Sequence, residues 1–328
     1  MKERVLITGA SGFIGYHIIQ EALKNNLEVY AAIRKSSNIA HLKDLDIKYT
    51  YPDFGDVSSL QKEFADKKYD YIIHAAGATK ARSQEEYNTI NAGYTQNLAT
   101  AVLESGIQLK KFVLLGSLAA VGPLDNLIEV LTENSVPKPV TAYGKSKLLG
   151  EEQLKAFATL NFTILKPTGV YGPRDKDIFI FFKQIARGIE PYIGNTEQKF
   201  SFLYVTDLAR ATIKALFNGN RGTFILSDGN SYDRYQLAAF IKDSMGVKAI
   251  KFHLPVKFVK IIAYLSEKYC ALNKKASTLN IEKLNELMAV SWHCDIGNAR
   301  TGLGFEPEYD LKAGVAESVK WYKTNKWL

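Results

Sequence analysis

A tyrosine and a lysine lie four residues apart in the segment Thr141–Leu154 (TAYGKSKLLGEEQL). The segment is typical of a helix, where positions i and i+4 share one face, so Tyr143 and Lys147 would lie side by side. A positive charge beside a phenol favours the phenolate and lowers its pKa, which is about 10 in isolation. Two unit charges about 4 Å apart interact by roughly 4 kcal/mol at an effective dielectric of about 20, enough for about two to three pKa units. The pair is therefore a candidate for acid/base catalysis, although the same spacing also occurs on ordinary amphipathic helices.

A serine upstream of this pair is a third candidate. The apolar run Lys111–Leu115 predicts a buried strand that ends at Gly116 and Ser117. Ligands of open α/β sheets collect at the carboxyl ends of strands, so a hydroxyl at this point can hydrogen-bond a substrate carbonyl or alcohol. The alternative is that Ser117 only caps the turn that follows it.

The first 24 residues have the pattern of a dinucleotide-binding unit. An apolar run, Val5–Thr8, is followed by the glycine-rich stretch GASGFIG and then by a helical pattern through Lys24. In such a strand–turn–helix unit, Gly9 permits the tight turn, Gly12 lets the backbone approach a pyrophosphate and Gly15 lets the helix pack on the strand. The amides of the helix N-terminus would face the phosphates. The predicted cofactor contacts here are Gly9, Ser11, Gly12, Phe13, Ile14 and Gly15.

The second predicted strand, Val29–Ile33, indicates which dinucleotide is preferred. NAD-selective sites carry an acidic residue near the end of this strand, but here the strand is followed by Arg34 and Lys35. The planar guanidinium of an arginine fits a 2′-phosphate. The sequence therefore favours NADP over NAD, with a merely exposed Arg34 as the alternative.

Two further strands complete the predicted first half. Small residues follow Tyr71–His74 and would let the cofactor lie against the backbone, whereas the strand Ile47–Tyr51 leads to an aspartate that can contact the adenine amine. His74 itself is predicted to be structural. The predicted cofactor contacts in these two places are Asp53, Phe54, Ala75, Ala76 and Gly77. Because helical segments separate the strands, the fold class is α/β, a Rossmann-type doubly wound parallel sheet.

At this point the chain resembles the extended short-chain dehydrogenase/reductases, the NAD-dependent epimerase/dehydratase family. The resemblance covers essentially the whole chain in order. The matching stretches are TGASGFIG at 8–15, DFGD at 53–56, HAAG at 74–77, YGKSK at 143–147, KPTGVYGP at 166–173 and YVTDLA at 204–209.

The resemblance implies a role for each matching residue. Ser117 would bind the substrate oxygen. Tyr143 would be the general acid/base and also a cofactor contact, and Lys147 would tune Tyr143 and hold the nicotinamide ribose. Asn91 would support a proton relay. Three residues match the loop beside the nicotinamide carboxamide: Pro167, Thr168 and Val170. Together these residues would fix an oxygen and move its proton while hydride passes between the nicotinamide and the adjacent carbon.

The resemblance also divides the chain. Residues 1–168 with 203–226 would form the dinucleotide-binding domain, and 169–202 with 227–328 a smaller, mostly C-terminal substrate-binding portion. Within the latter, 178–182 is dense in aromatic residues and would be an apolar lid or core packing. We expect Phe179 and Phe182 to face the pocket or core, and Lys183 and Arg187 to face solvent, because each pair shares one helix face.

The amphipathic segment 255–272 leaves three alternatives. It is too charged to span a bilayer, and it would form a lid or pack in the core. An interfacial membrane helix is the third alternative.

The substrate prediction rests on departures from the sugar-nucleotide enzymes, which usually carry an asparagine where this chain has Thr168-Gly169. The acidic stretch of dehydratases has no clear counterpart, since Leu131-Thr132-Glu133 does not align with it. We therefore predict an NADP-dependent oxidoreductase that interconverts a ketone and a secondary alcohol on a bulky small molecule, as in the dihydroflavonol-reductase-like branch. The alternatives are a nucleotide-sugar epimerase or dehydratase with tightly bound NAD(P), and a non-catalytic binding module.

Composition narrows the partners. The chain has 328 residues, and its formal charge of +8 is scattered in short lysine runs, which argues against nucleic acid as a partner. Two cysteines fit a reducing, cytoplasmic location, and neither a signal peptide nor a membrane span is predicted. A lone His293-Cys294 pair does not make a metal site, so no metal is expected. The resemblance implies a homodimer through the helices at 87–105 and 142–158.

Overall fold

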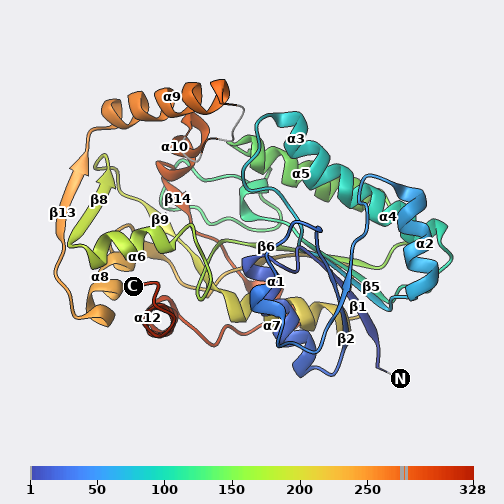
Figure 1. Ribbon diagram of the computed structural model, residues 1–328. Coiled ribbons are helices and arrows are strands. Elements are labelled where there is room, and N and C mark those ends of the chain that lie inside the picture. The colour runs from blue at the N-terminus through green and yellow to red at the C-terminus, as the bar shows by residue number, and fades with distance from the viewer. Residues whose placement is uncertain (1, 274–276, 278–279) are drawn as a thin grey trace.

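The computed structural model describes residues 2–273, 277 and 280–328, and its centre is a seven-stranded parallel sheet (Figure 1). The strand order is β11-β6-β5-β4-β1-β2-β3, so the chain builds outward from β1 to β3 and then restarts on the other side at β4. The reversal between β1 and β4 is the point where doubly wound sheets bind ligands. The predicted doubly wound α/β sheet is confirmed. Its strands are β1 (Arg4–Thr8), β2 (Glu28–Ala32), β3 (Lys48–Thr50), β4 (Tyr71–His74), β5 (Lys111–Leu115), β6 (Phe162–Pro167) and β11 (Gly222–Leu226).

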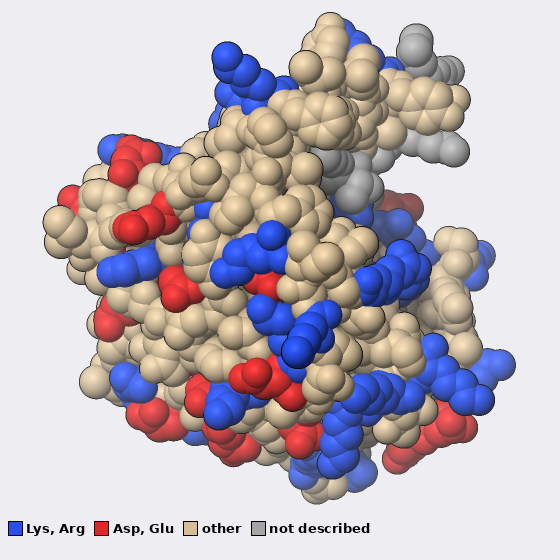
Figure 2. All heavy atoms as spheres, turned by 90° about the vertical axis from the view of Figure 1, so that its left-hand side faces the viewer, with Lys and Arg blue, Asp and Glu red and all other residues tan. Residues whose placement is uncertain are grey.

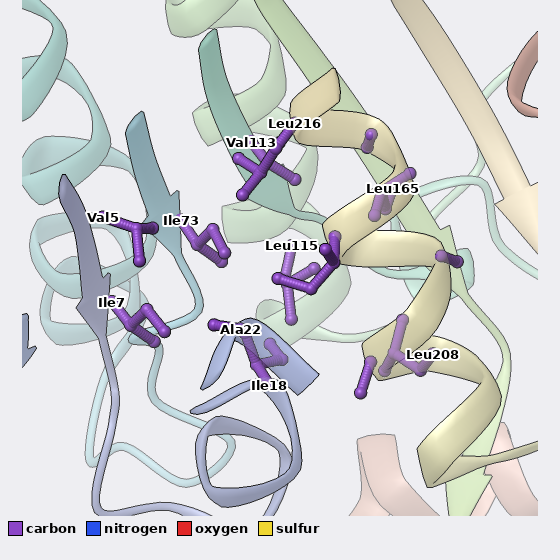
Figure 3. Packing of buried hydrophobic residues seen from close by; sticks show 14 of the residues in the cluster. Val5, Ile7, Ile18, Ala22, Ile73, Val113, Leu115, Leu165, Leu208 and Leu216 are labelled. Carbon is purple, nitrogen blue, oxygen red and sulfur yellow. The ribbon is translucent and has the colours of Figure 1, made fainter. Parts of the chain in front are cut away.

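Helices cover both faces of this sheet, which explains why the strands are continuous apolar runs. Alternate residues of one strand enter different cores: Val5 and Ile7 of β1 lie in one cluster and Leu6 in the other. The first core includes Ile18 of α1 and Leu208 of α7 and is shown in Figure 3. The helices over this face are α1 (Phe13–Lys24), α7 (Val205–Phe217) and α11 (Gly297–Leu303), and those over the other are α2 (Val57–Lys67), α4 (Tyr94–Glu104) and α5 (Ala142–Lys155).

A third core lies in the smaller portion. Phe182 is fully buried there, and the ring of Phe179 lies 4.6 Å from that of Tyr322 between centroids. Lys183 and Arg187 are exposed, as the helical spacing predicted. The helices of this portion are α6 (Phe179–Ala186), α8 (Gln236–Met245) and α12 (Leu311–Thr324). Its short strands are β7 (Gly169–Tyr171), β8 (Ile189–Ile193), β9 (Lys199–Phe200), β10 (Phe202–Tyr204), β12 (Tyr232–Asp233), β13 (Ile250–Leu254) and β14 (Ser291–Trp292).

One segment of the C-terminal half belongs with the first core. Ile296, Ala299, Leu303 and Phe305 are buried together with residues of β11 and α7. The proposed division, which gives all of 227–328 to the smaller portion, therefore does not follow the packing at α11. The reason is that α11 returns to cover the β11 edge of the sheet.

The amphipathic segment forms α9 (Val256–Leu272), which lies at the top of Figure 1 beside α10 (Ile281–Leu287). Among the α9 residues whose burial is described, 256–270, only Val259 and Ala263 are buried, against Leu284 of α10. Core packing is therefore wrong for most of this part of the helix. Within the described residues, no helix combines the length and the apolar character needed to cross a membrane.

Candidate active site

The glycine-rich turn has the geometry that the sequence predicted. Gly9 has φ +68°, and a Cβ on it would lie 2.8 Å from the backbone of Ala75, so a side chain at Gly9 would collide with the chain after β4. A Cβ on Gly15 would lie 2.2 Å from the carbonyl oxygen of Gly9. The first turn of α1 carries no acidic residue, and no side chain caps its first amides. The turn thus presents bare backbone where α1 begins, which fits an anionic phosphate.

A cavity of about 520 Å³ opens beside this turn, at the carboxyl ends of β1, β2 and β4. Ten of the predicted cofactor contacts line it: Gly9, Ser11, Gly12, Arg34, Lys35, Asp53, Phe54, Ala75, Ala76 and Gly77. Phe13, Ile14 and Gly15 lie in the first turn of α1 and do not line it. Ser37, Tyr51 and Tyr94 line it although the sequence did not indicate them. Tyr94 arrives from α4 and lies near Phe54 (5.7 Å between ring centroids), a proximity that only the fold creates.

The rim of this cavity is positively charged. Arg34 and Lys35 are both exposed, and neither forms an ion pair with another described residue. Their turn is closed by a hydrogen bond from the Arg34 amide to Ser37 Oγ (3.1 Å). Asp53 is exposed and uses one carboxylate oxygen to accept from the Gly55 amide (2.9 Å). The cationic rim and the bare backbone of the glycine turn fit the phosphates of a dinucleotide.

A second cavity, of about 450 Å³, contains Ser117 and Tyr143. Thr141 begins α5 by accepting a hydrogen bond from the Gly144 amide (3.0 Å), which fixes Tyr143 in the first turn. Ser117 follows β5, and its Oγ accepts from the Ala119 amide (3.1 Å). Ser117 therefore caps its turn, as the alternative interpretation held, and also faces the cavity beside the tyrosine.

Lys147 lies between the two cavities. Its buried Nζ donates to the Leu115 carbonyl (2.5 Å), and a Cβ on Gly77 would lie 3.7 Å from that Nζ. Gly77 lines the first cavity, whereas Tyr143, one helical turn away on α5, lines the second. The lysine is thus placed to touch a group that extends from the dinucleotide cavity toward the tyrosine.

Burial dominates the electrostatics of this pair. It raises the pKa of Tyr143 to about 12, while a hydrogen bond with Ser117 acts in the opposite direction. Burial also lowers the pKa of Lys147 to about 8, against a smaller opposing effect of the Glu151 carboxylate. The sequence predicted a lowered tyrosine pKa, so the direction is wrong in this structure. The reason is that desolvation penalises the phenolate, and the ammonium is directed at the Leu115 carbonyl.

Asn91 links two segments of the site through side-chain hydrogen bonds. It lies in a π-helical turn (Thr89–Gly93), and its side-chain amide accepts from the Ala78 amide (2.7 Å) and donates to Ser146 Oγ (2.9 Å). These bonds fasten the segment after β4 to α5. The side chain therefore positions Gly77 and Lys147 relative to each other, and a proton relay through it stays a prediction.

The second cavity is lined mainly by apolar side chains. Pro167 and Thr168 line it, whereas Val170 packs against the first core. The predicted contact of these three residues with the nicotinamide carboxamide stays a prediction. From α6 it receives Phe181, preceded by Ile178, rather than Phe179 or Phe182. Further apolar lining that the sequence did not indicate comes from Tyr192, Ile193, Phe200, Phe202, Leu237, Leu287 and Trp292.

The sequence did not indicate which cationic side chains line the second cavity. Arg174, Lys176, Lys183 and Arg187 are absent from its lining; the guanidinium of Arg174, for instance, lies 4.1 Å above the ring of Tyr16. Two other cations line the cavity, and both have partners. Arg234 donates to the carbonyls of Thr196 (2.5 Å) and Ile193 (3.0 Å), and Lys283 pairs with Glu286 (2.8 Å). No sequence signal marks them, because the turn after β12 that holds Arg234 and the helix α10 that holds Lys283 reach the cavity only in the folded chain.

Other polar candidates have structural partners. His74 is buried beside Thr8 (2.7 Å), and burial lowers the pKa of its imidazole to about 3, as expected for a structural residue. Glu133 accepts from the Ile225 amide (2.7 Å), outside the cavity. The described part of the chain holds no group of three His, Cys, Asp or Glu residues placed to bind a metal ion.

Curated relatives align over nearly the whole chain. A ceramide reductase of Caulobacter vibrioides is 25% identical over 327 residues, 99% of this chain and 96% of the relative. A decarboxylating sterol-4-alpha-carboxylate 3-dehydrogenase of Candida albicans is 24% identical, with 97% of each chain covered.

Solved structures share the fold. A UDP-glucose 4-epimerase of Thermotoga maritima with UDP-glucose has a TM-score of 0.81 at 22% identity, covering 98% of this chain and 99% of the other. A UDP-glucuronic acid 4-epimerase of Bacillus cereus with UDP-glucuronic acid and NAD has a TM-score of 0.76 at 23% identity, with the same coverage.

The family model for the NAD dependent epimerase/dehydratase family matches residues 5–225. That range holds the glycine turn, Ser117 and the two candidate catalytic side chains of α5, Tyr143 and Lys147. The resemblance noted from the motifs is therefore confirmed, whereas the dihydroflavonol-reductase-like branch stays a prediction. The chain belongs to the NAD-dependent epimerase/dehydratase family and is an NAD(P)-dependent enzyme of the extended short-chain dehydrogenase/reductase type.

Proposed function

We propose that this protein is an NADP-dependent oxidoreductase that interconverts a ketone and a secondary alcohol on a bulky, largely apolar substrate. The observation that carries the proposal is the second cavity, where Ser117 and Tyr143 meet a wall of aromatic and aliphatic side chains. Ile178, Phe181 and Phe202 favour a substrate that loses apolar surface to them on binding.

Three side chains would handle the substrate oxygen. Ser117 donates a hydrogen bond to the carbonyl, and Tyr143 transfers its phenolic proton to that oxygen as it becomes an alcohol. Lys147, when protonated, stabilises the phenolate that Tyr143 leaves behind. The nicotinamide of the bound cofactor would supply the hydride at the adjacent carbon. Gly77 and Lys147 would hold its ribose, and Thr168 would lie beside its carboxamide.

The names of two relatives support an apolar substrate. One is named for the reduction of a ceramide and the other for the oxidation of a sterol carboxylate. Both align over almost all of this chain, so the segments that line the second cavity are included. We therefore propose a lipid-like ketone or alcohol as the substrate class.

A nucleotide-sugar epimerase is the second candidate. The solved structures of epimerases with UDP-sugars share the fold, and Arg234 and Lys283 bring positive charge to the cavity. The guanidinium of Arg234 already donates to two backbone carbonyls, and Lys283 already has a carboxylate partner. A diphosphate would have to compete with these partners, which favours the first candidate.

NADP preference and a homodimer remain proposals. Arg34 and Lys35 at the rim of the first cavity support NADP, because neither has a carboxylate partner among the described residues. The dimer would form through α4, α5 and the short helix α3 (Gln84–Asn88) that precedes the π-helical turn.

The test is a comparison of net turnover with ligand binding. We expect steady oxidation of NADPH with hydrophobic ketones and none with UDP-sugars. Calorimetry with UDP, GDP and dTDP in the presence of NADP is the second arm. Micromolar binding of any of these nucleotides, with no net NADPH turnover on any ketone, would overturn the proposal in favour of the epimerase.

The pH dependence of ketone reduction should reflect the loss of the proton from Lys147. Because the pKa of Tyr143 is about 12, its phenol stays protonated over the working range, whereas Lys147, with a pKa of about 8, loses its charge as the pH rises through 8. We expect kcat/KM to be flat below about pH 8 and to fall about tenfold for each unit above it. The exposed Lys145, changed to Met, should leave this profile unchanged. A profile that stays flat to about pH 10 would contradict the role given to Lys147.

A further inference from the structure

Helix α9 carries an apolar face that the rest of the described chain leaves uncovered. Five residues at helical spacing i, i+3, i+4, i+7 and i+11 form it, and their side chains are 41–69% exposed. We call these five the α9 face: Phe258, Ile261, Ile262, Leu265 and Tyr269. The helix is held to the protein by a different stripe, Val259 and Ala263. Contiguous apolar side chains of this kind mark an interaction site on a monomeric surface.

Helix α9 also carries exposed lysines. Lys257, Lys260 and Lys268 of the same helix are exposed, and Glu267 is its only acidic residue. Helical geometry places Lys257 and Lys268 beside the face and Lys260 farther round the helix. None of the three lysines forms an ion pair with a described residue. In Figure 2 the helix projects from the top of the molecule as a mostly uncharged ridge with Lys and Arg side chains beside it.

We propose that the α9 face binds the surface of an anionic lipid bilayer, with the helix lying in the plane of the membrane. Apolar side chains on one face and lysines beside them are the composition of interfacial helices. The helix has 17 residues and lacks the length and apolar character needed to span a bilayer, which agrees with a helix that lies on the membrane. This inference selects the third alternative that the sequence left open for 255–272.

A second copy of the chain fits this surface less well. In a symmetric pair the same three lysines of both copies would be brought together, with one glutamate from each helix to offset them. Like charges in apposition disfavour such a pairing, whereas anionic headgroups neutralise the lysines.

The position of α9 connects the membrane to the second cavity. Leu284 of α10 packs on α9, and the neighbouring Lys283, Glu286 and Leu287 of the same helix line the cavity. Glu282 of α10 also accepts a hydrogen bond from the Ala142 amide at the start of α5 (2.7 Å). A bilayer bound to the α9 face would thus lie one helix away from α10, which lines the cavity. If the proposed function holds, on which this step rests, the substrate is a lipid-like ketone or alcohol drawn from the membrane.

The experiment is flotation of the full chain with vesicles of phosphatidylcholine alone and of an equal mixture with phosphatidylglycerol. We expect binding to the anionic vesicles and little to the neutral ones. The double variant Ile261→Glu/Leu265→Glu should lose at least about tenfold in affinity, because it places two carboxylates in the face that enters the interface. The control is Ile128→Glu/Val136→Glu, which changes two apolar residues outside α9 that are even more exposed and should bind like the parent.

A second pair of variants separates charge from apolar contact. Lys257→Gln/Lys260→Gln/Lys268→Gln should weaken binding by roughly fivefold for each lysine. The triple control Lys312→Gln/Lys320→Gln/Lys323→Gln removes the same charge from exposed positions of α12 and should have little effect. Unfolding temperature and dinucleotide binding of every variant should match the parent, because all of these positions are exposed and outside both cavities.

Either of two results would overturn the proposal. One is that the parent does not bind anionic vesicles. In that case, a dimer seen by light scattering and abolished by the α9 double variant would show that a second copy of the chain covers the face instead. The other is equal binding by the α9 variants and their controls. The assay contains neither substrate nor turnover, so such a failure would leave the NADPH assays with ketones, and the proposed function, unaffected.

Discussion

Replacing Tyr143 by phenylalanine should lower kcat for ketone reduction by a factor of roughly 100 to 10,000, the usual contribution of a general acid/base. The substitution removes only the hydroxyl at the position where α5 begins, in the same cavity as Ser117. The ring remains, so packing and fold should be kept. The measurement is kcat for NADPH-dependent reduction, together with the dissociation constant of NADPH, which should change little because Tyr143 does not line the dinucleotide cavity.

Tyr87 offers a matched control for this substitution. Its ring lies 6.3 Å from that of Tyr143 between centroids, and its hydroxyl donates to the Thr79 carbonyl (3.2 Å) rather than facing the second cavity. Tyr87→Phe should retain activity within a factor of about three, since surface-near changes of this size cost about 0.5 kcal/mol. Retention of more than about one tenth of the parent activity by Tyr143→Phe would refute the assignment of the acid.

Replacing Arg34 by alanine should weaken NADP binding by about 10- to 150-fold and leave NAD nearly unchanged. The guanidinium lies at the rim of the dinucleotide cavity and has no ion-pair partner among the described residues, so it is free to bind a 2′-phosphate. One charge-assisted hydrogen bond contributes on the order of 1.5–3 kcal/mol, and two would place the effect above this range. Titration of both cofactors onto parent and variant is the measurement.

Arg187→Ala is the control, because Arg187 is an exposed arginine that ends α6 outside both cavities. It should leave both cofactors unaffected. Equal or tighter binding of NAD than of NADP by the parent would show the proposed preference to be wrong.

The nucleotide-binding half of this protein follows from local patterns in its sequence. Apolar runs such as Val5–Thr8 are buried on both faces, and a glycine with positive φ at Gly9 cannot be replaced without a collision with Ala75. Patterns of this kind are local: a strand, a tight turn and a helix N-terminus each depend on neighbours within a few residues. For the same reason the four-residue spacing of Tyr143 and Lys147 is enough to predict that both lie on one helix, which is α5.

The electrostatics and the surroundings of these residues depend on long-range packing in the folded chain. The direction of the Tyr143 pKa follows from desolvation and from the Leu115 carbonyl that takes the Lys147 ammonium, and neither is encoded in the spacing of the pair. The second cavity gathers Phe181, Arg234 and Trp292 from three separate segments, whose meeting depends on long-range packing. Helix α9 is the clearest case. Its apolar residues form two stripes, and periodicity alone cannot tell which of them is buried. In the structure Val259 and Ala263 meet Leu284 of α10 and are buried, whereas the α9 face stays exposed.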